Sequence, residues 1–417
     1  MRSRRHRRKL AAAATVAVLG AALSACSSAG SSGGGSASGS GSVNIGLVGQ
    51  FSGNLSSSFG GLPKVLDAWA SAVNASGGLN GKHVNVVSED TGAQADGAAI
   101  GKQLAQDNVS GVVEWGLGAT NDNTWLTYLE SKKIPVIMAA PPATAAALQD
   151  PLAFPVTGAG PTALYAFVAT AKTLGPKLGV AYCSDDSACA SVPALFKAVA
   201  GPIGVDMAAT VEAPSTAPDY TTVCQAFKTN DVASYYLNFA SAAAVRITNT
   251  CAQQGVTAAQ LLTAGTASPG WKTDSSFTGD IVIDNSAPYF DTSIPAVAAY
   301  RAALGKYAPS IPGTALDNSA GLWMWAAGQL IKTAATRSAG TVTRASIING
   351  LYSLKQDTLG GIVQPLTFIR SKPTWLPCWF NWKIAKAGQF QAVDNAKPTC
   401  APQSVVNAVV SEVIKAS

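Results

Sequence analysis

Short runs of β-branched residues alternate along the chain with stretches whose apolar residues recur at helical spacing. This pattern predicts strands at residues 43–48, 84–87, 111–114 and 135–138, separated by helices at 62–75, 95–106 and 123–131. Strands that alternate with helices argue for a parallel sheet with helices on both faces. The first part of the chain is therefore predicted to form one doubly wound lobe.

The same alternation restarts after residue 161. Strands are predicted at 178–182, 206–211, 234–237, 261–263 and 281–283, with helices at 164–173, 192–199, 221–229 and 242–254. Helices at 295–307, 318–336 and 344–351 follow, with late strands at 363–368 and 379–384. We therefore predict an α/β fold with two doubly wound, Rossmann-like lobes.

The first 25 residues have the pattern of a secretory signal peptide. Six basic residues fall among the first nine, and residues 10–25 form an uncharged apolar run. The competing interpretation is a transmembrane anchor, but a 16-residue helix rises only about 24 Å, short of a hydrocarbon core of about 30 Å. Residues 26–42 are almost entirely Gly, Ser and Ala, a composition typical of a flexible tether.

The apolar run ends in Leu23-Ser24-Ala25-Cys26, which resembles the lipobox of bacterial lipoproteins. The resemblance implies cleavage before Cys26 and lipidation of its thiol, which holds the protein at a membrane surface. An ordinary signal peptide followed by a chance cysteine is the alternative.

The net charge of +6 belongs to the N-terminal segment. The first 25 residues hold six of the 29 Lys and Arg and no acidic residue, which leaves 23 basic against 23 acidic residues. A neutral body lacks the clustered basic face of a nucleic-acid-binding protein, so no nucleic-acid partner is expected.

Six cysteines follow Cys26, an even number suited to an oxidising compartment. Six thiols allow 15 connectivities, and pairing each with its nearest partner gives Cys183–Cys189, Cys224–Cys251 and Cys378–Cys400. No Cys-x-x-Cys or Cys/His cluster is present, and no Gly-x-Gly-x-x-Gly follows the first predicted strand. We therefore expect neither a metal nor a cofactor.

Nothing in the sequence favours an enzyme. Its Gly-x-Ser-x-Gly motif, at residues 30–34, falls in the predicted tether, whereas a nucleophile elbow needs a strand before it and a helix after it. His83 is the one histidine after the signal peptide, and it stands in a turn far from any nucleophile candidate in the sequence.

The segments 43–53 and 74–82 together resemble the start of the type I solute-binding proteins, the branched-chain amino acid binding group. Residues 111–116, 133–137 and 320–327 extend the resemblance. It implies two doubly wound lobes joined by a hinge of three chain crossings, with the ligand held in the cleft between them.

By that pattern the N-lobe is residues 43–159 plus 289–374, and the C-lobe is residues 160–288 plus 375–417. The crossings are expected near Gly160, Ala287 and Thr374. The cleft is also where open α/β sheets bind ligands, because helix N-termini meet there beyond the carboxyl ends of the strands.

Relatives hold a ligand carboxylate with two loops of the first lobe, and an aromatic residue packs on the ligand. Plain helix capping by Thr120, Asn121 and Thr144 is the alternative role for these loops. The positions that correspond here are Phe59, Gly118, Ala119, Thr120, Asn121, Ala143 and Thr144.

The second lobe departs from the family pattern. Where relatives that bind amino acids place an acidic residue, residues 264–267 hold none, and Phe239 stands where a phenol is often found. A buried ammonium group without a partner costs several kcal/mol, so an amino acid ligand is doubtful unless Asp185, Asp186 or Asp291 substitutes. The candidate contacts from this side are Asp186, Ser187, Phe239, Thr266 and Tyr289; for Tyr289 a packing role at the hinge is equally expected.

The resemblance implies an extracytoplasmic, lipid-anchored substrate-binding protein of an ABC importer. Its partners would be a small polar or carboxylate-bearing ligand, the permease and ATPase subunits, and the membrane through Cys26. A ligand sensor for a membrane receptor is one alternative, and a hydrolase on the same scaffold is another.

Overall fold

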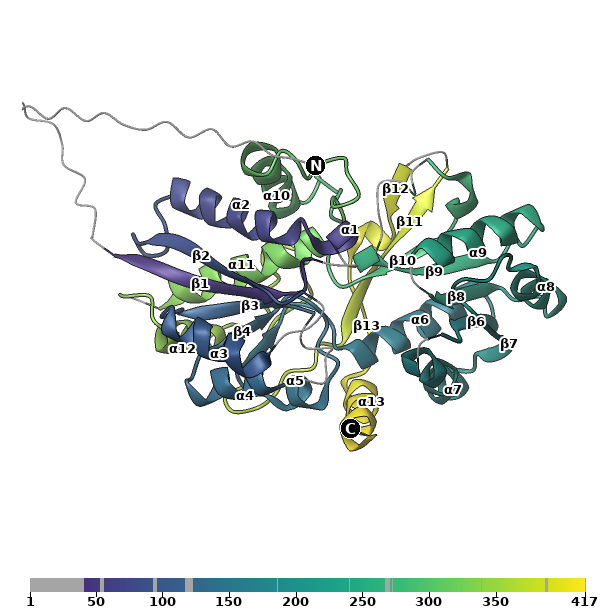
Figure 1. Cartoon of the computed structure of the whole chain (residues 1–417), viewed down its shortest axis with the longest axis horizontal. Helices are drawn as coiled ribbons and strands as arrows, with labels where there is room; N and C mark the ends of the chain where they lie inside the picture. The colour runs from purple at the N-terminus through teal and green to yellow at the C-terminus, as the bar shows by residue number, and fades with distance from the viewer. Residues whose placement is uncertain are drawn as a thin grey trace, which may run out of the picture. The chain divides into compact units, whose positions relative to one another are not determined.

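The protein forms two sheets surrounded by helices in a computed structural model (Figure 1). Residues 1–40, which include the predicted signal peptide, Cys26 and most of the tether, lie outside the described residues. The structure describes residues 41–52, 56–92, 96–116, 123–185, 187–239, 241–266, 271, 273–338, 340–386 and 389–416.

The first sheet has five parallel strands in the order β2-β1-β3-β4-β5. The three inner strands are almost wholly apolar and buried, as expected for a parallel sheet covered on both faces. The strands are β1 (Ser42–Gly49), β2 (His83–Asp90), β3 (Gly111–Trp115), β4 (Val136–Met138) and β5 (Ala153–Pro155).

Helices from two distant parts of the chain pack around this sheet. The early ones are α1 (Ser56–Phe59), α2 (Leu62–Ala75), α3 (Gly97–Gln106), α4 (Thr124–Ser131) and α5 (Ala145–Gln149), and the later ones are α10 (Pro295–Tyr307), α11 (Ser319–Arg337) and α12 (Arg344–Tyr352). Helix α11 packs against α2, β3 and β4. Gly328 permits the close approach of α11 to α2, because a Cβ there would lie 2.5 Å from the Trp69 ring.

The second sheet has eight strands, with β12-β11-β10-β9-β8-β6-β7 in order and β13 paired to β11. The five strands from β6 to β10 are parallel, and β11 and β12 are antiparallel additions from the end of the chain. The strands are β6 (Lys177–Cys183), β7 (Asp206–Ala213), β8 (Ser234–Asn238), β9 (Ala259–Thr263), β10 (Ile281–Asp284), β11 (Cys378–Ala385), β12 (Gln389–Ala392) and β13 (Thr399–Cys400).

Two groups of helices pack on the second sheet. Helices α6 (Gly160–Leu174), α7 (Val192–Ile203) and α13 (Gln403–Ala416) share one apolar core with β6 and Trp379. Helices α8 (Thr221–Thr229) and α9 (Ser241–Gln253) share another. Short 3₁₀ segments complete the chain: η3 (Ser187–Ser191), η4 (Ala264–Thr266), η6 (Ser275–Phe277) and η7 (Asp394–Ala396).

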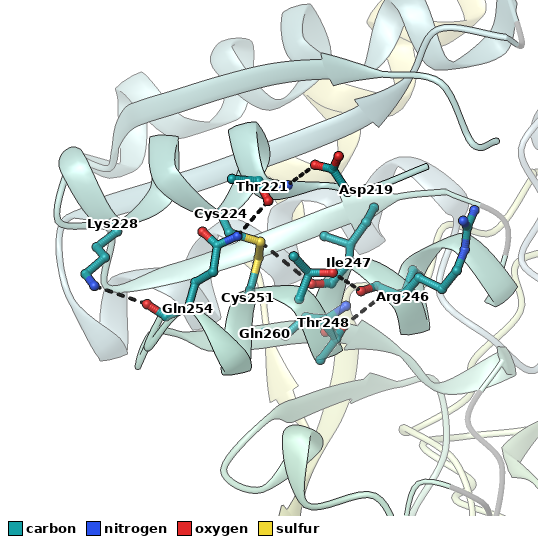
Figure 2. The surroundings of a disulfide bond; sticks show 12 residues. Asp219, Thr221, Cys224, Lys228, Arg246, Ile247, Thr248, Cys251, Gln254 and Gln260 are labelled. Atoms are coloured by element: carbon teal, nitrogen blue, oxygen red, sulfur yellow. Dashed lines mark hydrogen bonds between the residues drawn. A yellow bond between two sulfur atoms is a disulfide. The ribbon is translucent and has the colours of Figure 1, made fainter. Parts of the chain in front are cut away.

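The three cysteine pairs predicted from the sequence are all bonded in the structure. The Cys224–Cys251 bond joins α8 to α9, and both cysteines are fully buried (Figure 2). Around it the Gln254 amide donates to Thr221 Oγ1 at 3.0 Å, so polar contacts reinforce the same helix pair.

The predicted fold class is confirmed, but the strand expected at residues 363–368 is wrong. Apart from an isolated bridge between Asp357 and Leu366, this segment pairs with no strand. Pro365 has no N–H group to donate to a neighbouring strand. The segment is instead a loop in which the apolar side chains of Val363, Leu366 and Phe368 are buried. Within the described ranges, no helix has the length and apolar character needed to cross a membrane.

Candidate functional site

A cavity of about 260 Å³ opens where strands of both sheets end. Strands β3 and β4 of the first sheet and β9 and β10 of the second reach it with their carboxyl ends, and the first turns of α6 border it. This is the position at which open α/β sheets bind ligands. The lining residues are Phe59, Trp115, Gly116, Ala140, Pro141, Gly158, Thr162, Ala163, Ala166, Phe167, Thr263, Gly265, Ile283, Asn285, Trp323, Cys378 and Trp379.

Aromatic rings form much of the cavity wall. The ring centroids of Phe59 and Trp115 lie 5.0 Å apart, and those of Trp115 and Trp323 lie 5.9 Å apart, so these three rings form a continuous row. Phe167 and Trp379 line the cavity from α6 and β11. None of the lining residues in the described part of the chain is charged.

The first turn of α6 borders the cavity, but its backbone donors are already used. Gly160 N donates to the Pro142 carbonyl at 2.9 Å, position 161 is a proline, and Thr162 N donates to the Ala159 carbonyl at 2.8 Å. A helix N-terminus binds an anion through N–H groups that have no partner. This helix end therefore offers no such group to a carboxylate.

Asn285 and Thr162 are two polar residues among those that line the cavity. Asn285 Oδ1 accepts from Gly158 N at 3.0 Å, which leaves the amide NH₂ of Asn285 as a donor without a partner among the described residues. The hydroxyl of Thr162 is buried and likewise has no hydrogen-bond partner among them.

The carboxylate of Asp284 lies fully buried behind the aromatic wall. It accepts from the indole N–H groups of Trp323 and Trp382, each at 2.8 Å, and from Ser319 Oγ at 2.6 Å. Burial raises the pKa of Asp284, and these hydrogen bonds act in the opposite direction. Because Trp323 lines the cavity, Asp284 fixes one of its walls and occupies the indole donor.

Of the predicted ligand contacts, Phe59 lines the cavity. Thr144 caps α5: its Oγ1 accepts from Ala147 N at 3.3 Å and donates to Asn123 Oδ1 at 3.1 Å. Neither Thr144 nor Ala143 is among the lining residues, and their contact with a ligand stays a prediction. Outside the described residues lie Gly118, Ala119, Thr120, Asn121 and Asp186.

Phe239 and Tyr289, two further predicted contacts, are not among the residues that line this cavity. Phe239 packs against Tyr220 with centroids 6.2 Å apart, and Tyr289 is buried against Phe290 and Trp382. Ser187 begins η3 and Thr266 ends η4. Their ligand roles stay predictions.

Of the three aspartates proposed as partners for an ammonium group, Asp186 lies outside the described residues, and the other two accept hydrogen bonds from nearby serines. Asp185 accepts from the backbone and hydroxyl of Ser215, and Asp291 accepts from those of Ser293. The described part of the chain contains no cluster of side chains suited to a metal ion.

Four further wall residues were not predicted as ligand contacts: Trp115, Phe167, Trp323 and Trp379. Trp379 is buried and also lines the cavity. For Trp115 the sequence does contain a signal, because this residue directly follows the strand predicted at residues 111–114 and precedes a glycine, Gly116, which has positive φ.

Two α/β sheets with a cavity at the carboxyl ends of their strands define a ligand-binding protein rather than a particular chemistry. A model of the periplasmic binding protein family matches residues 42–384. The chain therefore belongs to the periplasmic binding protein family, and its relatives are solute-binding proteins of ABC-type transporters.

Solved structures with different ligands share the fold. A fatty acid ABC transporter substrate-binding protein from Thermomonospora curvata is 18% identical, with 90% of this chain and 94% of that chain covered and a TM-score of 0.67. A solute-binding protein from R. palustris in complex with 4-hydroxybenzoate is 15% identical, with coverage of 86% and 97% and a TM-score of 0.66. A branched-chain amino acid binding protein from Streptococcus pneumoniae in complex with isoleucine is 15% identical, with coverage of 84% and 99% and a TM-score of 0.63. No curated protein matches the sequence.

Proposed function

We propose that this protein is the extracytoplasmic substrate-binding subunit of an ABC importer and captures a small solute in the cavity. The observation that carries the proposal is the position of the cavity. Its walls come from the carboxyl ends of strands in both sheets, so one ligand contacts Trp115 from the first sheet and Ile283 from the second. The three relatives described above, whose ligands differ, support a solute-binding role without fixing the solute.

In this mechanism the two lobes are residues 43–159 plus 289–374 and residues 160–288 plus 375–417. A ligand that touches both lobes stabilises the form in which the walls are together, because it binds that form better than the separated one. The permease then recognises the closed form, and the membrane anchor at Cys26 keeps the protein near it.

Hydrogen bonds lie close to all three proposed crossings. Asn285 accepts from Gly158 N at 3.0 Å, near the first and second crossings. The side chain of Gln364, which is fully buried, donates to the Cys378 carbonyl at 2.9 Å and accepts from Cys378 N at 2.8 Å, on either side of the third. These contacts support a hinge in which the crossing strands move as one unit.

A thermal-shift screen of the purified protein tests the binding role. The panel holds amino acids, aliphatic and aromatic carboxylates, amides, alcohols and polyols. We expect at least one compound to raise the melting temperature, because a ligand at 100 times its Kd stabilises the folded state by about 2.7 kcal/mol.

Chromatography of the same sample after incubation checks that the compound is recovered unchanged, which separates a binder from a hydrolase. A melting temperature that no compound in the panel raises would contradict the proposal.

A further inference from the structure

We propose that the cavity selects an uncharged ligand whose buried part is a ring or a short branched alkyl group, with one polar group directed at Asn285. This inference rests on the proposed binding function and names the substrate class of the same site. It narrows the predicted class, a small polar or carboxylate-bearing ligand, to its uncharged members.

The described walls provide no partner for a charge. A buried ion without a compensating charge or hydrogen bonds is strongly disfavoured, and none of the lining residues that the structure describes is acidic or basic. Asp284 lies between the lining residues Ile283 and Asn285 in the sequence, but its carboxylate is not available to pair with a charged ligand. Its carboxylate is fully buried and already accepts from Trp323, Trp382, Ser319 and the backbone of Ser286.

A ligand carboxylate has no backbone anchor at α6. Gly160 N and Thr162 N donate to carbonyls of the protein, and Pro161 has no N–H. The helix end nearest the cavity therefore supplies none of the unpaired donors with which a helix N-terminus holds an anion.

The aromatic wall is held rigidly, which suits a flat or compact apolar group. The indole N–H of Trp323 is bound to Asp284 at 2.8 Å. At the other end of the ring, a Cβ on Gly265 would lie 3.4 Å from Cη2 of Trp323, so the ring edge rests against this backbone. A wall fixed at both ends loses little side-chain freedom when a ligand packs on it.

The size of the cavity sets the size of the ligand. A dry cavity of about 150 Å³ accommodates benzene, so 260 Å³ is enough for on the order of ten non-hydrogen atoms. The NH₂ group of Asn285 is a hydrogen-bond donor. An oxygen of a carbonyl, hydroxyl or amide group on the ligand accepts from it.

Isothermal titration with pairs of compounds that differ mainly in charge tests the inference. The pairs are benzamide with benzoate, benzyl alcohol with benzylamine, and isovaleramide with isovalerate, with leucine as a further charged probe. We expect the neutral member to bind at least tenfold more tightly in at least one pair, with no pair reversed. Equal or tighter binding of the charged members, or of leucine, would overturn the inference and leave the proposed function standing.

The wider thermal-shift panel separates the two proposals. A polyol or amino acid that stabilises the protein while all the neutral paired probes fail overturns the substrate class alone. Failure of every paired probe and every panel compound contradicts the binding function, and the substrate class with it.

One variant assigns the binding to this cavity. Asn285→Asp keeps an oxygen for Gly158 N and replaces the NH₂ donor by an anionic oxygen, so we expect benzamide to lose at least tenfold in affinity and benzylamine to gain. Asn407→Asp, on the exposed face of α13, is the matched control. An unchanged affinity of Asn285→Asp for both compounds would place the ligand elsewhere and overturn the inference.

Discussion

Two buried aspartates differ in the hydrogen bonds that their carboxyl groups accept, and therefore in their effect on the protein. Asp284 has donors on both of its oxygens and holds Trp323 and Trp382 in place. Asp150, at the end of α5, accepts from Leu152 N at 2.7 Å through one oxygen, and its other oxygen has no partner among the described residues. Burial raises the pKa of Asp150 to about 7. The first carboxyl group organises the cavity wall, and the second destabilises the protein once it is charged.

The raised pKa of Asp150 predicts a stability that falls as pH rises. Below the unfolded pKa of 3.8 both states are protonated; between that value and about 7 the unfolded state releases its proton while the folded state keeps it. Asp150 therefore costs as much as about 4 kcal/mol above pH 7. In urea unfolding at pH 5 and pH 8, we expect the stability of Asp150→Asn relative to wild type to be higher at pH 8 than at pH 5.

The exposed residue Asp206 provides the control. Asp206→Asn should follow the wild-type curve at both pH values. A constant difference between Asp150→Asn and wild type from pH 5 to pH 8 would show that Asp150 is already ionised in the folded protein at pH 5 and would contradict the raised pKa.

Only part of the cavity wall could be predicted from single residues. Phe59 was predicted because it matches a position of the family pattern, and Trp115 directly follows the strand predicted at residues 111–114. Trp323 lies within a helix that is buried on all sides, and in a sequence such a residue has the same pattern as any core tryptophan. Asn285 was missed because its role depends on Gly158, a contact between distant segments that no local pattern contains.

Helices were predicted best where the periodic pattern of apolar residues was long and where residues typical of helix ends marked their bounds. The predicted bounds of α2, α8 and α10 agree with the structure, and proline stands in the first turn of α2 and α10. Helix α13 was missed. It follows the Cys378–Cys400 bridge and buries Val406 and Val410 in the core of α6 and α7.

Removal of a disulfide is expected to lower the free energy of unfolding by an amount that increases with the length of the loop that it closes. Cys224–Cys251 spans 27 residues and Cys183–Cys189 spans six. Each bridge lowers the conformational entropy of the unfolded chain. This stabilises the folded protein by about 3.5 kcal/mol for the longer loop and by about 2 kcal/mol for the shorter loop. We therefore expect the Cys224→Ala/Cys251→Ala variant to lose more free energy of unfolding in urea than Cys183→Ala/Cys189→Ala.

Reduced wild-type protein serves as the reference for both double variants. A larger loss on removal of the shorter bridge would show that loop entropy does not determine the order.

At the scale of the whole molecule, the alternation of strands and helices was enough to predict two parallel sheets. It was not enough for the order of the strands. The antiparallel addition of β11 to β10 joins residues from distant parts of the chain, and pairing of that kind is set by tertiary packing. The lobe boundaries and the anchored N-terminus stay predictions.

The proposed anchor has a direct test in cell fractionation. Lipidation of Cys26 attaches acyl chains that partition into a membrane, so wild-type protein should sediment with membranes and enter the detergent phase. Cys26→Ala should move to the soluble fraction, and Ser27→Ala should behave like wild type. A Cys26→Ala protein that still sediments with membranes would contradict lipidation at this residue.

The late position of β11 in the chain has a consequence for biogenesis. Ile281 of β10 pairs with Lys383 of β11, and the first sheet is covered by α11 and α12 from residues 319–352. Neither layer can be finished until most of the polypeptide has left the ribosome, and such long-range pairing is slow to form. Much of the nascent chain thus remains unfolded for longer. An unfolded polypeptide is the form that can pass through a narrow translocation channel before it folds on the far side.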